Sequence, residues 1–529
     1  MDLKRLTAAA ILPALACTAH AATFVVNKNS DDGSVNTLRW AIQASNAAGG
    51  SNTILVVPPH PNWVIMLNSS LPPIQGPAVV RALGAAHEPY TLPASSEPQI
   101  RQPVRVSAEY GRPAVVLDGS NFINPTTVNS CPAQNGVGAG PNVRSLLYPA
   151  LQVVDSGNVD ISGFEIRHIC IGIMLLRSHD NHLHHNLIHD TVGAAGILVT
   201  GDDGSAAGNS TVGLSTRNLM EYNVTYNTGD GMECTRGTSD SVYQYNIMYE
   251  TRTGVAPYSQ GVECAGSGVT GISFLFNRII GFSDGFMHNS ASNVLDRGNI
   301  IEGTTYGITD TGGGTNVLIR ENLITRNRMG IGVSGNASQA TITQNSIYDN
   351  GQPLVSLSTS AGGTTDPNSP ALLGIDLGIN GVTANAAAGN CSAPGPDSAQ
   401  NYPVLNAATS SWQEGELVLN GSLPACPNAS YVVELFANQR LNAAGFAEGE
   451  LYLGSIAVTT DSTGNASFHF RRSLDDALPR DVRQAWFTAT ARTAAGGTSE
   501  FSAPIVLSGS PGRDDDGDGG RHNDGDARR

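Results

Sequence analysis

The sequence predicts an all-β protein, built mainly as a solenoid of short parallel strands and followed by a small β-sandwich. Three observations predict this fold class: an Asn marker that recurs along the middle of the chain, a Gly marker at a fixed distance after it, and short pairs of apolar residues that alternate with polar ones. The composition agrees, because 60 glycines and a charged fraction of 14% favour strands joined by many tight turns.

The Asn marker defines the repeat. It precedes an apolar stretch at seven positions, which are Asn186, Asn223, Asn246, Asn277, Asn299, Asn322 and Asn345. The last four are 22 or 23 residues apart, a spacing too short for a solenoid of helical hairpins, which needs about 33 residues. Leucine-rich repeats have this length, but their regular leucine pattern does not occur in this sequence.

The Gly marker places strands within each repeat. A Gly followed by an apolar residue lies eight residues after the Asn at Gly231, Gly254, Gly285, Gly307 and Gly330. The apolar residues that follow form alternating pairs, such as Ile197 and Val199, and a period of two indicates strands with one face inward. Each repeat is therefore expected to form one coil, with the Asn residues stacked as hydrogen-bonded ladders.

Over residues 149–350 these repeats resemble those of the pectate-lyase-like right-handed parallel β-helix superfamily, which implies right-handed coils. Residues 22–57 resemble the N-terminal cap of bacterial β-helix proteins that carry a Cys-Ser-Leu-Arg-Glu-Ala-Ile motif. Asn36 and Trp40 stand here in place of the Cys and Glu of that motif. The apolar face of Leu38, Ala41 and Ile42 is kept, so a short helix is expected to cover the open end of the solenoid.

The predicted organisation begins with a signal peptide over residues 1–21, because Lys4 and Arg5 precede a short apolar run and a small-residue cleavage pattern. The sequence then predicts an N-terminal cap with first coils over 22–148, β-helix repeats over 149–380 and a linker over 381–403. An Ig-like β-sandwich over 404–508 and a disordered Asp/Gly/Arg-rich tail over 509–529 complete the chain.

Export predicts a secreted or cell-surface protein in which disulfides can form. The expected mature chain has six cysteines, which are Cys131, Cys170, Cys234, Cys264, Cys391 and Cys426. No later segment has the apolar length of a membrane helix. The net charge of −16 argues against a nucleic-acid partner, whose phosphates require Lys and Arg. Lysine occurs only at positions 4 and 28, which excludes a lysine base in the repeat region.

Aligning Gly231 with Gly261 places Glu233 and Glu263 side by side on neighbouring coils, pointing outward. Stacked strands lie about 4.8 Å apart, so such a pair would need a proton or a cation such as calcium. It could then serve as acid and base on a sugar, with Arg236 and Arg278 as ligands for substrate carboxylates. The alternative is a pair of solvated glutamates that splay apart.

The same register predicts an inward column that contains Cys234, Cys264, His288 and Asp310. The two cysteines could form a disulfide or remain buried thiols. His288 and Asp310 lie one coil apart, and they could form a structural pair or a general base oriented by a carboxylate.

The segment from Asp284 to Asn289 is similar to the Asp-Pro-His-Asp segment of β-helix uronate epimerases, although the Pro and the second Asp are missing. Some pectate lyases of this fold use an arginine as base. These resemblances imply Asp284, His288 and an arginine as catalytic groups. Together with Asp310 of the inward column, the candidate catalytic residues are His288, Asp310, Asp284 and Arg252.

A histidine-rich stretch offers a further candidate site. It contains His168, His179, His182, His184, His185 and His189. His182, His184 and Asp180 alternate, so they are expected to share one strand face, which could hold a transition metal. The alternative is a set of exposed turn histidines.

Three functions follow from these observations. The first is a secreted β-helix that engages extracellular or cell-surface polysaccharide along its strand face. The second is a polysaccharide lyase or uronate epimerase, and the third is a non-catalytic adhesin or structural protein. The oligomeric state stays open at this point.

Overall fold

The computed structural model describes residues 21–95, 100–123, 148–191, 195–202, 213–251, 259–335, 339–352, 372–391, 396–407, 409–413, 416–473, 485–494 and 496–507. The expected tail, Arg252 and nearly all of the expected signal peptide lie outside these residues. The chain divides into two compact units, residues 1–300 with 355–363, and residues 301–354 with 364–529.

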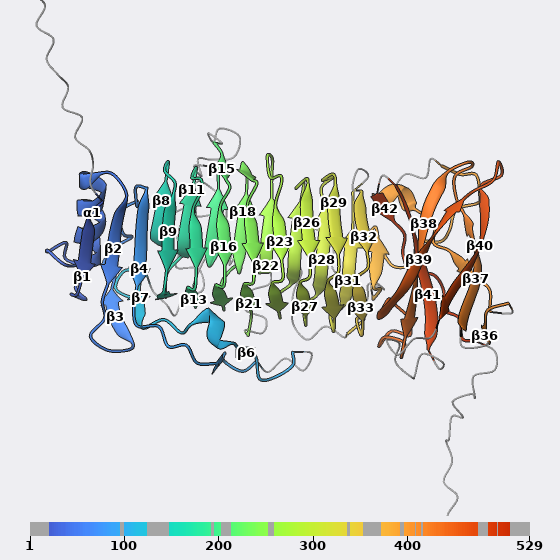
Figure 1. Ribbon diagram of the computed structural model, residues 1–529, viewed down its shortest axis with the longest axis horizontal. Helices are drawn as coiled ribbons and strands as arrows, with labels where there is room; N and C mark the ends of the chain where they lie inside the picture. The colour runs from blue at the N-terminus through green and yellow to red at the C-terminus, as the bar shows by residue number, and fades with distance from the viewer. Residues whose placement is uncertain are drawn as a thin grey trace, which may run out of the picture. The chain divides into compact units, whose positions relative to one another are not determined.

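The first unit is a right-handed parallel β-helix, in which each complete coil contributes one strand to each of three parallel sheets (Figure 1). In this unit the first sheet contains β1 (Thr23–Val26), β2 (Asn52–Val56), β4 (Ala78–Ala82), β9 (Val159–Ser162), β12 (His182–His184), β16 (Leu219–Glu221), β20 (Val242–Gln244), β23 (Ser273–Leu275) and β26 (Val294–Arg297). The second contains β3 (Trp63–Met66), β7 (Val115–Asp118), β10 (Phe164–Arg167), β13 (Leu187–His189), β17 (Val224–Tyr226), β21 (Ile247–Tyr249) and β24 (Arg278–Ile280). The third contains β8 (Pro149–Val154), β11 (Ile171–Leu176), β14 (Ile197–Thr200), β18 (Met232–Thr235), β22 (Gln260–Ala265) and β25 (Asp284–Asn289).

Both sequence markers have a physical role in these coils. Along much of the ladder, the side-chain oxygen of a marker Asn accepts from the side chain of the Asn one coil earlier, as between Asn223 and Asn246 at 3.1 Å and between Asn246 and Asn277 at 3.0 Å. At Gly231 an added Cβ would lie 2.4 Å from the carbonyl oxygen of Gly261. The Gly marker therefore marks a corner where backbones of neighbouring coils approach too closely for a side chain.

The N-terminal helix α1 (Leu38–Ala48) packs at the start of the first unit, next to β1 and β2. Its buried residues are Leu38, Ala41, Ile42 and Ser45, which confirms the apolar face predicted from the sequence. Thr37 caps the helix by accepting from the backbone N–H of Trp40. The helix thus covers apolar side chains that no earlier coil would cover.

A separate segment lies against the outward face of the second sheet. It contains β5 (Tyr90–Thr91), β6 (Arg105–Val106) and the short 3₁₀ helix η1 (Ala108–Tyr110). Its Leu92, Val104 and Val106 share an apolar cluster with Leu187 and Ile247 of that sheet. A two-stranded parallel sheet of β15 (Ser215–Thr216) and β19 (Thr238–Ser239) completes this unit.

The second unit combines further parallel strands with an antiparallel β-sandwich. Its parallel strands are β28 (Tyr306–Thr311), β29 (Val317–Arg320), β30 (Leu323–Thr325), β31 (Met329–Val333), β32 (Ala340–Thr343), β33 (Ser346–Tyr348) and β34 (Ile375–Leu377), and β27 (Ile300–Glu302) begins at the last residue of the first unit. One sandwich sheet contains β35 (Val404–Leu405), β36 (Ser411–Gln413), β37 (Glu416–Pro424) and β40 (Asn465–Ser473); the other contains β38 (Ser430–Asn438), β39 (Leu451–Thr459), β41 (Trp486–Thr493) and β42 (Gly496–Thr498). A 3₁₀ helix η2 (Pro396–Ala399) precedes them.

Four buried carboxylates bind backbone N–H groups at the end of the parallel strands. Asp397 accepts from Ala340 at 2.8 Å, Glu434 from Gln344 at 3.0 Å, Glu448 from Asn350 at 3.1 Å, and Glu500 from Leu377 at 3.1 Å. These groups would otherwise be unsatisfied, because no further coil follows to supply carbonyl oxygens. We call these four side chains the carboxylate cap. Among the described residues, no helix is long and apolar enough to cross a membrane.

Candidate functional site: a buried carboxyl cluster and a histidine cluster

Three carboxyl side chains come together on the third sheet. Glu233 of β18 and Glu263 of β22 are direct register partners, as the aligned Gly markers predict. Asp230 precedes β18, and one oxygen from each of the three side chains lies within 4.8 Å of the others. The sequence pointed to the two glutamates but missed Asp230, because it lies before the Gly marker and outside the alternating pattern.

The expectation of two solvated glutamates was wrong. Glu233 is 6% exposed and Glu263 is 7% exposed. Their outward column continues through Leu198 of β14 and Met174 of β11, and both of these side chains are also buried. The outward face of the third sheet is therefore covered here, so water cannot screen the two charges as it would on an open face.

This burial strongly affects proton binding at Asp230. The pKa of its carboxyl is raised well above the ordinary value because the side chain is desolvated, and because Glu233 and Glu263 place negative charge beside it. A hydrogen-bonding contact with Glu233 raises the pKa further. Asp230 therefore holds a proton more readily than an exposed aspartate does, and the cluster places this group beside two further carboxyl groups.

Asp284 lies near this cluster in register. The backbone N–H of Gln260 donates to Asp230 at 2.6 Å, and Gln260 is paired across the sheet with Asp284 of β25. The Asp284 carboxylate is buried and accepts from the Ser283 hydroxyl at 2.8 Å. Its position in the adjacent coil makes it a neighbour of the cluster.

The candidate arginines are distributed over different elements. Arg236 follows β18 and binds Asp202 at 2.8 Å through its guanidinium, so it lies in the same stretch of chain as Glu233. Arg278 lies in β24 of the second sheet, on a different face from Glu233 and Glu263. Arg252 is outside the described residues.

The inward column has the predicted register. Cys234 pairs with Cys264, and Cys264 pairs with His288 in the next coil. Cys234 and Cys264 form a disulfide, which decides between the two alternatives for this pair. Cys391 and Cys426 lie in contact as thiols.

His288 and Asp310 are both fully buried. The Nε2 atom of His288 lies 2.9 Å from a carboxylate oxygen of Asp296 in β26, a residue that the sequence did not single out. Asp310 lies in β28 of the second unit, where Val333 is its register partner. Burial raises the pKa of Asp397, and the charge of Asp310 adds a smaller contribution. The buried His288–Asp296 pair fits a structural role within the core.

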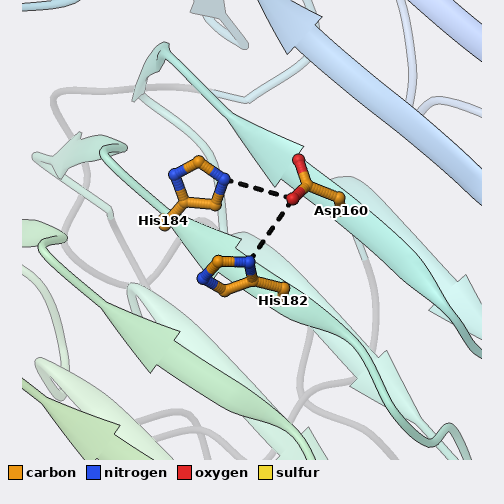
Figure 2. Close-up of side chains that lie close together, drawn as sticks. All are labelled: Asp160, His182 and His184. Atoms are coloured by element: carbon orange, nitrogen blue, oxygen red, sulfur yellow. Dashed lines mark hydrogen bonds and ion pairs between the residues drawn. The ribbon is translucent and has the colours of Figure 1, made fainter.

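The histidine-rich stretch divides between two sheets. His182 and His184 lie on the outward face of β12, where His182 is the register partner of Asp160 in β9. The same carboxylate oxygen of Asp160 lies 3.4 Å from Nδ1 of His182 and 3.2 Å from Nε2 of His184 (Figure 2). Asp180, which was expected on this face, instead binds Arg217 at 2.7 Å. We call Asp160, His182 and His184 the histidine cluster.

His189 belongs to the second sheet. Its ring nitrogens lie 2.8 Å from Asp190 and 3.2 Å from Glu165, and the ring stacks on Tyr226 at 4.5 Å. These two carboxylates raise the pKa of His189, although burial opposes them as the largest single effect. His168 lies beside Asp118 at 3.2 Å. Neither residue is part of the histidine cluster.

Among known proteins, the chain matches a family model over part of its length and a protein over nearly its full length. A family model described as a right-handed β-helix region matches residues 260–369. The chain is 28% identical over 508 residues to a 3-dehydroshikimate dehydratase from Acinetobacter baylyi, and the match covers 92% of this chain and 96% of that protein.

Two solved structures have a similar fold. The A-module of a mannuronan C-5 epimerase from Azotobacter vinelandii has a TM-score of 0.40 and 12% identity, with 60% of this chain and 73% of that chain covered. An alginate lyase from Paenibacillus has a TM-score of 0.37 and 13% identity, with 64% of this chain and 99% of that chain covered. The parallel coils, together with the region matched by the family model, show that the chain has a right-handed parallel β-helix fold.

Proposed function

We propose that this chain is a lyase that removes water from a small polyhydroxylated ring acid of the 3-dehydroshikimate type. The observation that carries the proposal is the carboxyl cluster of Asp230, Glu233 and Glu263, whose oxygens lie within 4.8 Å of one another and whose buried position favours proton binding at Asp230. The similarity to a 3-dehydroshikimate dehydratase supports the substrate class, because it extends over nearly the full length of both chains.

The chemistry requires one base and one acid. The proton on the carbon next to the ring ketone is acidic, and a carboxylate can remove it to give an enolate. The enolate then expels the hydroxyl on the following carbon, which leaves as water once it has received a proton. For 3-dehydroshikimate, the remaining ring rearranges to an aromatic dihydroxybenzoate, so aromaticity favours the products.

The cluster supplies both groups. Glu263 acts as the base in this proposal, and Glu233, which shares a proton with Asp230, donates to the departing hydroxyl. Asp230 is a positioning residue, since it is almost completely buried and interacts with Glu233. Arg236 lies three residues from Glu233, and its fixed guanidinium suits the carboxylate of a ring acid.

Burial distinguishes this proposal from action on a polysaccharide. A long sugar chain requires an open strand face, whereas Glu233 and Glu263 are covered. Polysaccharide lyase activity is the second candidate, because the same acid and base could expel a sugar oxygen from a uronate. Calcium bridging of the carboxyl groups belongs to that candidate, since their oxygens are close enough to share one ion.

We also propose that the protein works outside the cytoplasm. The Cys234–Cys264 disulfide is of a kind that persists in oxidising compartments. The charged and apolar pattern of the first 21 residues has the form of an export signal.

The test is to incubate the full-length mature protein with 3-dehydroshikimate and to follow the ultraviolet absorbance of the aromatic product. Glu263→Gln should lower kcat by about 10²–10⁴-fold, because the amide cannot accept the substrate proton. Glu233→Gln should cause a loss of similar size. Glu416→Gln, at a half-exposed site in the second unit, is the matched control and should retain full activity.

A wild-type protein that gives no aromatic product would contradict the dehydratase proposal. Incubation with uronate polymers, with and without calcium, then tests the second candidate through the absorbance of unsaturated sugars. Loss of that activity in Glu263→Gln would assign the cluster to polysaccharide cleavage instead.

A further inference from the structure

The histidine cluster lies on a different sheet from the carboxyl cluster and has no part in the proposed dehydration. β9 and β12 are neighbouring strands in register, with Asp160 opposite His182 and Ser162 opposite His184. Leu183 between the two histidines is completely buried, so alternation turns both imidazoles outward. The fold therefore brings a carboxylate and two imidazoles together from adjacent coils (Figure 2).

The distances within the histidine cluster suit a shared ion. Nδ1 of His182 and Nε2 of His184 lie 3.4 Å and 3.2 Å from one carboxylate oxygen of Asp160. Ligands about 2.1 Å from a tetrahedral metal lie roughly 3.4 Å from one another. All three ligand atoms lie within 4.8 Å of one another. A divalent metal could bind here after only small movements of the side chains.

The partners on the far side of each imidazole support the same geometry. Nε2 of His182, the nitrogen turned away from Asp160, lies 2.9 Å from Glu221, and Glu221 in turn accepts from Gln244 at 2.7 Å. Nδ1 of His184 lies 2.7 Å from Nδ1 of His185. Histidines that bind metals usually have such an outer partner, which orients the ring and selects the nitrogen that binds.

The cluster is also accessible to solvent. The side chains of Asp160, His182 and His184 are 24%, 35% and 16% exposed. Asp160 and His182 line an open recess of about 390 Å³, together with Asn52, Asn158 and Asp180. A metal with only three protein ligands would have at least one open position for water or for an oxygen ligand from this side.

A purely ionic arrangement is the competing explanation. Two protonated histidines around Asp160 would form an ion pair, and Arg81 lies 3.8 Å from the other carboxylate oxygen. The metal titration described below separates the two explanations, because an ion pair among these side chains would take up no saturable equivalent of zinc.

We propose that Asp160, His182 and His184 form a binding site for one divalent transition-metal ion of the zinc or cobalt class. Glu221 positions His182 within this site. The preference for such ions follows from the imidazole ligands, whereas calcium and magnesium prefer oxygen ligands.

The test uses the full-length mature protein, prepared without a histidine tag and freed of metal with a chelator. Calorimetric titration with zinc should show one saturable equivalent per chain, and cobalt should give the visible absorption of a nitrogen- and oxygen-bound ion. His182→Ala or His184→Ala should abolish this equivalent. Glu221→Gln should weaken binding by about 10–100-fold, because it leaves the ligands in place but removes the partner that orients His182.

Two controls make the result decisive. The exposed His60→Ala should bind zinc like the wild type, because this histidine lies outside the cluster. Glu263→Gln should also bind zinc normally, whereas loss of binding in that variant would place the ion at the carboxyl cluster. Circular dichroism checks that each variant is folded. The proposal is overturned if the wild type shows no saturable equivalent, or if folded His182→Ala and His184→Ala bind zinc as tightly as the wild type.

Discussion

At the scale of single residues, Asp230 combines a role in the proposed dehydration with a cost in stability. Its pKa is raised well above the value of an exposed aspartate, first by desolvation and then by the neighbouring glutamates. The folded protein therefore holds this proton more tightly than the unfolded chain does. At a pH above the pKa of an unfolded aspartate, the free energy of unfolding is therefore lower than it would be without this shift, because the unfolded chain releases the proton more easily.

This difference predicts the pH dependence of Asp230→Asn. The stability linked to Asp230 is fully present below its unfolded pKa and is lost as the pH rises through its folded pKa. The amide does not titrate, so the melting temperature of the variant should rise relative to the wild type as the pH increases from about 4 to about 9. Thermal unfolding across that range measures the difference. Asp240→Asn, at an exposed site, should show no such trend, and a difference for Asp230→Asn that is constant with pH would contradict the prediction.

Only part of the carboxyl cluster could be predicted from the sequence. The repeat predicted that Glu233 and Glu263 are adjacent and point outward, and the structure has that register. Their burial was not predictable, because it depends on what covers the sheet. The position of Asp160 beside His182 and His184 was not predicted either. These residues lie on neighbouring coils of the first sheet, and the Gly marker gives the register of the third sheet only.

At the scale of elements, the Asn ladder holds the coils in register. Asn246 is completely buried. Its side chain donates to Asn277 at 3.0 Å and to the carbonyl of Met220 at 2.9 Å, while its oxygen accepts from Asn223. One residue thus connects three successive coils through hydrogen bonds that have no access to water.

Asn246→Ala should therefore destabilise the protein more than an ordinary surface change. The substitution leaves the Met220 carbonyl and the Asn223 donor buried without this partner, which costs about 1–3 kcal/mol for each group. Urea unfolding followed by circular dichroism measures the loss. Asn29, whose side chain bonds Val64 at the surface, offers a matched control: Asn29→Ala should change stability by less than about 0.5 kcal/mol. Equal losses in the two variants would argue against the role of the ladder.

A second ladder was missed although it is visible in the sequence. The residue before each marker Asn is aromatic at His185, Tyr222, Tyr245 and Phe276, and the rings stack at 5.2–5.3 Å. All four residues have positive φ angles of 53–56°. Positive φ is uncommon for such large residues, so propensity rules did not point to them. Stacking with the coils above and below compensates for the unfavourable backbone conformation.

At the scale of the whole molecule, the order of helix, parallel coils and antiparallel sandwich was predicted from the sequence. The carboxylate cap was not predicted. The helix at the start, the parallel coils and the antiparallel sandwich each have local periodicity that identifies them. The cap joins residues far apart in the chain, such as Asn350 with Glu448 and Leu377 with Glu500. Nothing in the local pattern around Glu448 or Glu500 distinguishes them from surface glutamates.

The carboxylate cap should make the second unit more stable at mildly acidic pH. Burial raises the pKa of Glu448 to about 7 and that of Glu500 to about 7, although bonds from backbone N–H groups oppose the shift. Stability is then greatest below about pH 4.5 for these groups and falls as the pH rises towards 7. At about 1.4 kcal/mol per pKa unit, the loss should be on the order of a few kcal/mol for each side chain.

Denaturant unfolding at a series of pH values measures this loss, and Glu448→Gln and Glu500→Gln should each flatten the slope between about pH 4.5 and pH 7. Glu416→Gln, which is not part of the cap, should leave the slope unchanged. A wild-type stability that increases over this interval would contradict the prediction.

The carboxylate cap also limits how long the solenoid can grow. A coil with unsatisfied donors is a template onto which another chain can add, which is how strand edges seed fibrils. Side-chain oxygens satisfy the donors of the final coil without offering a new edge in return. The end of the solenoid is thus encoded separately from the repeat, so whole coils could be added or deleted upstream without leaving a final coil onto which further chains could add.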